Sequence, residues 1–276
     1  MGNHRRREYS SYAFVAQGGR NLKNIPDLVL IHGFPLDQEM WAEQVRFFRA
    51  AGMGVLTPDL PGFGSRPGNP AHRCSIGAFA EDIHHFIARH ANSPCMIGGF
   101  SMGGYVLLAL LNRFPKDACA AIFIDTHPAA DTLEARQGRL KSIADLQAEG
   151  IGALRQMPDR LLSPSAPLQL RSRVAEMIAR QNPAGMIQAQ MAAAMRIDQS
   201  PHLPEIKIPT LVIGGAEDVI TPPNLMQRWC SQMPDSRWVE IPGAGHLTPM
   251  EAPEAVNAAI SHFVKQLPQI ALRPEN

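Results

Sequence analysis

Short apolar runs alternate with longer helical stretches along most of this chain, and this alternation limits the folds open to it. Six runs predict strands, at residues 28–31, 54–57, 95–98, 121–124, 211–213 and 238–241. Helical patterns lie between them, at residues 40–51, 75–90, 102–114, 223–233 and 253–267. Most of the runs are continuously apolar, as expected of strands covered on both faces. The sequence therefore predicts an α/β fold: a mostly parallel, twisted sheet with helices on both faces.

One interval, residues 128–200, departs from this alternation. It contains no strand pattern, and prolines at positions 158, 164, 167 and 183 divide it into short helical stretches rich in alanine, methionine, glutamine and arginine. We expect a core domain formed by residues 1–127 and 201–276, with residues 128–200 inserted as a helical cap.

Composition narrows the class of protein. The 276 residues are 45% hydrophobic and 18% charged, with a net charge of +1, which suits a globular protein and gives no reason to expect a nucleic-acid or anionic-membrane partner. No apolar stretch is long enough for a membrane span, and no export signal is visible, so a cytoplasmic location is expected. The four cysteines lack metal-ligand spacing, and we expect them to be structural: Cys74, Cys95, Cys119 and Cys230.

A Gly-x-Ser-x-Gly motif at residues 99–103 is the first candidate for chemistry. It follows an apolar strand and opens an apolar helix, and a serine on such a sharp strand-to-helix turn is exposed for nucleophilic attack. The glycines are needed because side chains beside the turn would clash. The alternative is an ordinary glycine-rich turn with a capping serine. We predict that Ser101 is a nucleophile.

His246 and Asp218 supply the other two candidate groups. Each follows a predicted strand, at the sheet edge where parallel sheets collect catalytic residues. A histidine there can act as general base, and an aspartate can accept its Nδ1–H and fix its tautomer. Asp218 is also a plausible turn residue, with Glu217 as a neighbouring competitor and Asp125, after another strand, as a rival acid.

The segment from His32 to Pro35 follows the first predicted strand and suggests an oxyanion hole. The backbone N–H groups of Phe34 and Met102 are the expected donors, since proline has no N–H to offer. His32 itself is expected to be structural, because His246 already provides a base.

Taken together, these segments resemble the α/β-hydrolase superfamily, in the usual order, from about residue 28 to residue 267. The segments that carry the resemblance are His32-Gly33, residues 59–65, the Gly-Phe-Ser-Met-Gly motif, residues 209–214 with Asp218, and Gly245-His246. Residues 33–37 with Met40-Trp41, residues 124–126 and 130–134, and residues 245–253 resemble the branch of 3-oxoadipate enol-lactonases and carboxylesterases. The short amino-terminal segment is a departure, since family members usually carry two strands before the His-Gly pair.

The resemblance implies a serine hydrolase that cleaves a small-molecule carboxylic ester or lactone through an acyl-enzyme, with no metal or organic cofactor. Two alternatives use the same triad: a carbon–carbon bond hydrolase of ring-cleavage diketones and a cofactor-free perhydrolase. A further alternative is a slow-turnover, hydrolase-like ligand receptor.

Candidate substrate contacts are less specific. An arginine of the cap, with Arg136 as the first choice, could bind a substrate carboxylate, and His32 and Asp125 are further candidates. Either a monomer or a homodimer is compatible with the sequence.

Overall fold

The computed structural model describes residues 26–66 and 75–267. Its six strands form one sheet in the order β2-β1-β3-β4-β5-β6, and every neighbouring pair is parallel. The strands are β1 Leu28–Ile31, β2 Val55–Leu56, β3 Cys95–Phe100, β4 Ala118–Ile124, β5 Thr210–Gly215 and β6 Ser236–Ile241. The predicted α/β class and parallel sheet are confirmed.

Burial follows strand position in the sheet. The inner strands β1, β3 and β5 are buried along their whole length, which explains their unbroken apolar sequences. The two edge strands differ: β2 has only two residues, and β6 is partly exposed and carries charged side chains. Short or charged strands at a sheet edge limit unwanted pairing with other chains.

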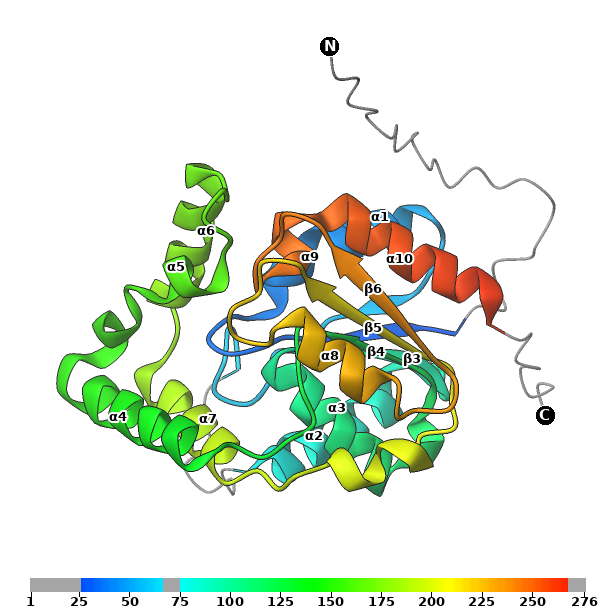
Figure 1. Cartoon of the computed structure of the whole chain (residues 1–276), viewed down its shortest axis with the longest axis horizontal. Coiled ribbons are helices and arrows are strands. Elements are labelled where there is room, and N and C mark those ends of the chain that lie inside the picture. The colour runs from blue at the N-terminus through cyan, green and yellow to red at the C-terminus, as the bar shows by residue number, and fades with distance from the viewer. Residues whose placement is uncertain (1–25, 67–74, 268–276) are drawn as a thin grey trace, which may run out of the picture.

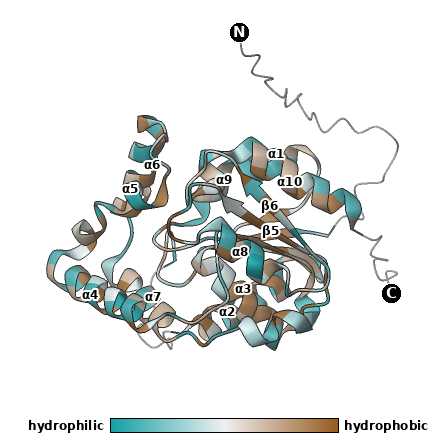
Figure 2. Cartoon of the chain, viewed as in Figure 1, coloured by the Kyte–Doolittle hydropathy of each residue, from teal (hydrophilic) through white to brown (hydrophobic). Residues whose placement is uncertain are grey.

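Helices cover both faces of the sheet (Figure 1). On one side lie α1 Ala42–Ala50, α9 Thr248–Glu251 and α10 Pro253–Gln266, and on the other lie α2 Ile76–His90, α3 Met102–Arg113 and α8 Pro223–Cys230. The N-terminus of α2 is capped by Ser75, whose hydroxyl accepts the N–H of Ala78. Figure 2 shows apolar residues concentrated on α3 and in the sheet, whereas α8 presents polar residues outward.

Residues 128–200 contain helices and no strand. They form α4 Leu133–Glu149, α5 Met157–Leu161, α6 Leu168–Ala179 and α7 Pro183–Ala194, which lie to one side of the sheet in Figure 1. Short 3₁₀ turns complete the described chain: η2 Gln38–Trp41, η3 Pro115–Asp117, η4 Gly150–Leu154 and η5 Ser200–Glu205. The two ends of this helical segment meet, because the N–H of Gln199 donates to the carbonyl oxygen of Pro128 at 2.9 Å.

Two expectations concern residues outside the described ranges: the short amino-terminal segment and the structural role of Cys74. Within residues 26–66 and 75–267, no helix combines the length and the apolar character that a membrane span requires.

Candidate active site

Ser101 lies between β3 and α3, on a strained turn. Its φ is +49° and its ψ is −113°, a left-handed backbone conformation that residues other than glycine rarely adopt. Three hydrogen bonds hold the turn. The N–H of Ser101 donates to Ile124 at 2.9 Å, and its carbonyl oxygen accepts from the N–H of Gly104 at 2.9 Å and from the hydroxyl of Thr126 at 2.8 Å. Strain maintained by its surroundings is typical of functional positions.

The glycines of the motif are required by close backbone approach. A Cβ atom at Gly99 would lie 2.4 Å from the carbonyl oxygen of Gly103, and a Cβ at Gly103 would lie 2.3 Å from the carbonyl oxygen of Ile31. Both distances are too short for any side chain. The helix after Ser101 therefore starts immediately beside β1 and β3, and its N-terminus favours negative charge near the serine.

The structure brings Ser101, His246 and Asp218 into one hydrogen-bonded chain. Nε2 of His246 lies 2.9 Å from Oγ of Ser101, and Nδ1 of the same ring lies 2.8 Å from Oδ2 of Asp218. His246 and Asp218 are only 2% and 3% exposed, whereas Ser101 is half-buried. The serine hydroxyl is therefore the accessible end of a buried chain of hydrogen bonds.

Asp218 is held as an anion by its neighbours. Its Oδ1 accepts the N–H groups of Ile220 and Thr221 at 2.7 and 2.9 Å, and its Oδ2 accepts the Thr221 hydroxyl at 2.6 Å. Burial alone would raise the pKa of Asp218, but the charge of His246 and the hydrogen bonds from His246 and Thr221 keep that pKa below its usual value. An ionised Asp218 can fix the imidazole tautomer and stabilise an imidazolium.

Asp125, the rival acid, occupies a different environment. It is fully buried with a φ of +46°, and its carboxylate accepts from the N–H of Gly215 at 3.0 Å and from the N–H and hydroxyl of Thr248 at 3.2 and 2.6 Å. Burial, together with the nearby charge of Asp218, raises the pKa of Asp125 well above its usual value. Asp125 ties the end of β4 to β5 and α9, and its full burial argues against the substrate contact expected from the sequence.

The predicted oxyanion donors flank the serine. A Cβ at Gly33 would lie 2.9 Å from the carbonyl oxygen of Phe100, so the Gly33-Phe34 turn abuts the end of β3. Among the described residues, no acceptor receives the N–H of Phe34 or of Met102. Two unused N–H groups on adjoining turns are compatible with an oxyanion hole.

The other two sequence candidates lie elsewhere. His32 is fully buried, accepts the N–H of Leu60 at its Nε2 at 2.9 Å, and contacts the carbonyl oxygen of Gly33 through Nδ1 at 3.1 Å. Burial lowers the pKa of His32, so the ring is a neutral structural link, which argues against the predicted substrate contact. Arg136 is exposed on α4, and no hydrogen bond or ion pair links its side chain to any residue in the described ranges.

Glu251 supports the histidine loop and was not singled out as a functional residue from the sequence. Its Oε1 accepts the N–H groups of Gly245 and Leu247, the two neighbours of His246, at 3.0 and 3.2 Å. Its Oε2 accepts the N–H of Ser163 at 2.8 Å, which connects the loop to the helical segment. The sequence signals were its position five residues after His246 and its place in the segment of residues 245–253 that resembles the enol-lactonase and carboxylesterase branch.

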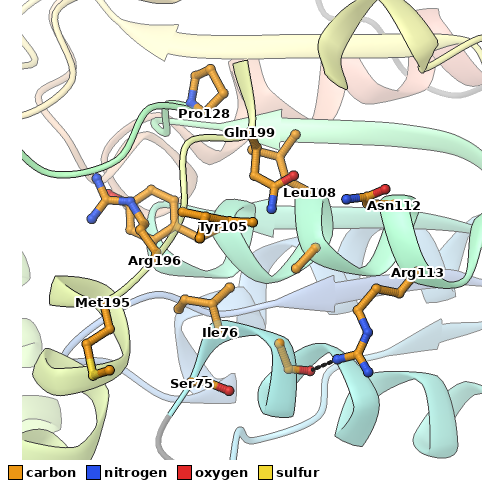
Figure 3. A pocket seen from close by; sticks show the side chains of 13 residues that line it. Ser75, Ile76, Tyr105, Leu108, Asn112, Arg113, Pro128, Met195, Arg196 and Gln199 are labelled. Carbon is orange, nitrogen blue, oxygen red and sulfur yellow. Dashed lines mark hydrogen bonds between the residues drawn. The ribbon is translucent and has the colours of Figure 1, made fainter. Parts of the chain in front are cut away.

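A polar cluster missed from the sequence lies beside the site. Arg196 stacks on the Tyr105 ring with its guanidinium carbon 4.2 Å from the ring centroid, lies 3.2 Å from Nε2 of His127, and pairs with Asp131 at 2.5 Å. Figure 3 shows Tyr105 and Arg196 together at one end of a mainly apolar cavity of about 250 Å³ between α2, α3 and residues 195–199. Burial and the charge of Arg196 lower the pKa of His127 to about 4. This cavity does not include Ser101.

The described residues offer neither a metal site nor a reactive cysteine. Among the described residues, no group of three or more His, Cys, Asp or Glu side chains is arranged to hold a metal ion. Cys95 and Cys230 are buried, and Cys119 is half-buried. Burial raises the pKa of the Cys119 thiol to about 11 and also raises that of the other two, as expected of structural cysteines.

The parallel sheet and the serine turn define an α/β hydrolase. The sequence profile described as "Alpha/beta hydrolase family" matches residues 28–259, and the chain belongs to this family. A Mycobacterium tuberculosis protein described as a putative non-heme bromoperoxidase, BpoC, is 31% identical over 235 residues, which cover 80% of this chain and 86% of that protein.

Two solved structures illustrate the likeness. A thermophilic esterase from Thermogutta terrifontis superposes with a TM-score of 0.82 and 33% identity, covering 87% of this chain and 90% of the esterase. The enol-lactonase from Burkholderia xenovorans LB400 gives a TM-score of 0.80 at 22% identity, with coverages of 90% and 94%, and shows the shared fold. The predicted resemblance to the family that includes esterases and enol-lactonases is confirmed.

Proposed function

We propose that this protein is a serine hydrolase that cleaves a small carboxylic ester or lactone through an acyl-enzyme. The observation that carries the proposal is the chain of hydrogen bonds from Ser101 Oγ to His246 at 2.9 Å and from His246 to Asp218 at 2.8 Å. A nucleophile, a base and an orienting acid in this order are the requirements for acyl transfer. The likeness to a solved esterase at 33% identity supports the same reaction class.

In the proposed reaction, Oγ of Ser101 attacks the carbonyl carbon while Nε2 of His246 takes the hydroxyl proton. The carbonyl oxygen becomes an oxyanion, which the N–H groups of Phe34 and Met102 stabilise. Collapse of this intermediate expels the alcohol, or opens the lactone ring, and His246 returns its proton to the leaving oxygen. Water, activated by the same histidine, then releases the acid and restores Ser101. Asp218 stabilises the imidazolium at both stages.

We also propose that residues 128–200 form a cap beside the site. Support comes from the contact between Ser163 and Glu251, because Glu251 also holds the loop of His246. Five methionines of this segment are Met157, Met177, Met186, Met191 and Met195. Met177 and Met186 are fully buried in the hydrophobic core, whereas Met191 and Met195 are exposed.

The test is hydrolysis of p-nitrophenyl acetate by the wild type and by Ser101→Ala at matched concentration. We expect the variant to lose several orders of magnitude in kcat, on the order of 10³ or more, as triad losses do. Ser231→Ala, which removes an exposed hydroxyl that donates only to the carbonyl oxygen of Arg228, serves as the matched control and should be unaffected. Equal activity of wild type and Ser101→Ala would refute the nucleophile assignment.

A second activity on the same site is perhydrolysis, favoured by the 31% identity to a protein described as a putative non-heme bromoperoxidase. Hydrogen peroxide would replace water in the second step: its oxygen attacks the acyl carbon, its proton passes to His246, and a peroxyacid leaves Ser101. A peroxyacid can oxidise bromide. We expect bromination of monochlorodimedone to require an acyl donor, peroxide and an intact Ser101.

Inert behaviour toward esters would favour one of the other two alternatives. If Ser101 is needed to hydrolyse a diketone produced by ring cleavage, the protein is a carbon–carbon bond hydrolase. Very slow turnover of every substrate, combined with strong stabilisation by one ligand, would identify a receptor.

A further inference from the structure

A buried carboxylate lies close to the Gly33-Phe34 turn, which carries the proposed oxyanion donor Phe34 and is called the oxyanion turn below. Asp37 is 3% exposed in its side chain and lies three residues after Phe34. Its own backbone is part of the adjoining turn, since the N–H of Met40 donates to its carbonyl oxygen at 3.1 Å and the N–H of Leu36 donates to Gly33 at 3.0 Å. The carboxylate also accepts the N–H of Glu39 at 3.0 Å and so caps η2. A shift of Asp37 would move the turn that carries Phe34.

The other partners of Asp37 come from the distant helical segment. Arg180 donates Nε to Oδ2 at 3.0 Å and Nη2 to both carboxylate oxygens at 2.9 and 2.8 Å. Gln181 donates Nε2 to Oδ2 at 2.8 Å. Both residues follow the last residue of α6, Ala179, and lie more than 140 positions from Asp37 in sequence. The junction of α6 and α7 is thus fastened to the turn that carries Phe34.

A second contact reinforces this attachment. Oε1 of Gln181 accepts the N–H of Gly64 at 3.0 Å, and a Cβ atom at Gly185 in α7 would lie only 2.0 Å from the carbonyl oxygen of Gly62. The loop of residues 59–65 is in turn linked to His32, whose Nε2 accepts the N–H of Leu60. The α6–α7 junction therefore rests on both core loops that border the oxyanion turn.

The positive charge of Arg180 also compensates the negative charge of Asp37. A carboxylate as buried as that of Asp37 is costly without compensation, and an unpaired negative charge near the oxyanion turn opposes the negative charge that develops there. Arg180 supplies the compensating positive charge and is 43% exposed, with Glu39 as an additional partner at 2.7 Å. Because a guanidinium stays protonated, this compensation does not vary with pH in the working range.

We propose that Arg180 is a positioning residue for the oxyanion turn, through which docking of the α6–α7 junction holds and neutralises Asp37. The inference rests on the proposed function, because an oxyanion forms only if Ser101 attacks a carbonyl. It assigns to the helical segment a part in the chemical step besides any contact with substrate.

The test compares Arg180→Gln, Arg180→Lys and the double variant Asp37→Asn/Arg180→Gln. We expect Arg180→Gln to lower kcat about tenfold with less than a threefold change in KM, below the 10²–10³ that follows loss of an oxyanion donor itself. Arg180→Lys keeps the charge and should retain most of kcat. The double variant removes the uncompensated charge, and we expect it to recover at least threefold over Arg180→Gln.

Arg155→Gln is the matched control, because Arg155 pairs with Glu149 in the same helical segment and does not contact the oxyanion turn. Its kcat should stay within about twofold of the wild type. Equal kcat values for Arg180→Gln and wild type, or a double variant no better than Arg180→Gln, would overturn the positioning role. If Arg180→Gln does not fold, Arg180→Lys and the double variant decide: kcat within about threefold of wild type in both supports the role, and a larger loss in either overturns it.

Labelling of Ser101 by a fluorophosphonate separates the two proposals. A wild type that is neither labelled nor active would refute the proposed function. A wild type that is labelled, with Arg180→Gln labelled at the same rate, would refute the positioning role alone. Slower labelling of Arg180→Gln by a factor similar to its loss in kcat is the expected result.

Discussion

Replacing Asp218 by asparagine tests the acid assignment, because the structure determines how the new amide would be oriented. In the wild type, Oδ1 of Asp218 accepts two backbone N–H groups, those of Ile220 and Thr221. In the Asp218→Asn variant the amide oxygen would stay at that position, since an NH₂ group there would face two donors. The NH₂ group would then occupy the Oδ2 position, 2.8 Å from Nδ1 of His246.

This orientation reverses the histidine tautomer. Nδ1 would have to accept from the new NH₂ group, so the ring proton would move to Nε2, which faces Ser101. A protonated Nε2 cannot take the serine proton, and the general base is lost. Loss of the correct tautomer by the same substitution in another serine hydrolase lowers kcat by about 10⁴, equivalent to roughly 5 kcal/mol in the activation barrier.

Asp125→Asn provides the contrast. Asp125 hydrogen-bonds to Gly215 and Thr248 and makes no hydrogen bond to His246, so an amide should cost roughly 1–3 kcal/mol of stability and less than tenfold in kcat. The assay is p-nitrophenyl acetate hydrolysis, with folding checked by thermal denaturation. Asp218→Asn within tenfold of wild type, or Asp125→Asn as inactive as Asp218→Asn, would refute the assignment.

Three further predictions concern stability. Gly103→Ala should prevent stable folding or abolish hydrolysis, because a Cβ atom at this position has no room. Gly138→Ala, at an open helix position in α4, should instead raise the free energy of unfolding by up to about 1 kcal/mol. Thermal melts would show the change in stability of each variant. Phe123→Ala removes a fully buried ring from β4 and should cost about 3–5 kcal/mol in urea unfolding. The pKa of His127 is lowered to about 4, so between pH 4 and 6.5 the folded state binds fewer protons than the unfolded state. The free energy of unfolding should therefore fall as the pH drops through this window. His127→Gln should flatten this pH dependence, and an unchanged slope in the variant would contradict the prediction.

The fold was predictable because its main signals are local. Short, mostly apolar runs locate all six described strands, and the helical pattern at residues 75–90 locates α2. Strand ends were less accurate. The sequence predicts that one strand ends at residue 98, yet β3 continues to Phe100, because Gly99 and Phe100 still pair with Phe123 and Ile124 of β4.

The three main residues of the candidate site were predictable because each of them follows a predicted strand. Ser101, Asp218 and His246 meet because the carboxyl ends of parallel strands share one edge. Supporting contacts were not predictable in the same way. Asp37 meets Arg180 across 143 positions, and Ser163 meets Glu251 across 88, and no local pattern encodes which distant side chains will pair. The sequence leaves a substrate contact open for His32 and Asp125, because it does not reveal that both are fully buried.

The hydrogen bond between Gln199 and Pro128 has a consequence for how this architecture can change. Since the two ends of the helical segment meet at Pro128 and Gln199, its length and sequence can vary without altering the register of β4 and β5. Insertions, deletions or exchange within the segment leave the sheet edge that carries Ser101 unchanged where they avoid three contacts: the α6–α7 junction with Asp37 and Gly64, Ser163 with Glu251, and Arg196 with Tyr105 and His127. A graft that keeps these contacts would give a new surface beside an unchanged sheet and Ser101 turn.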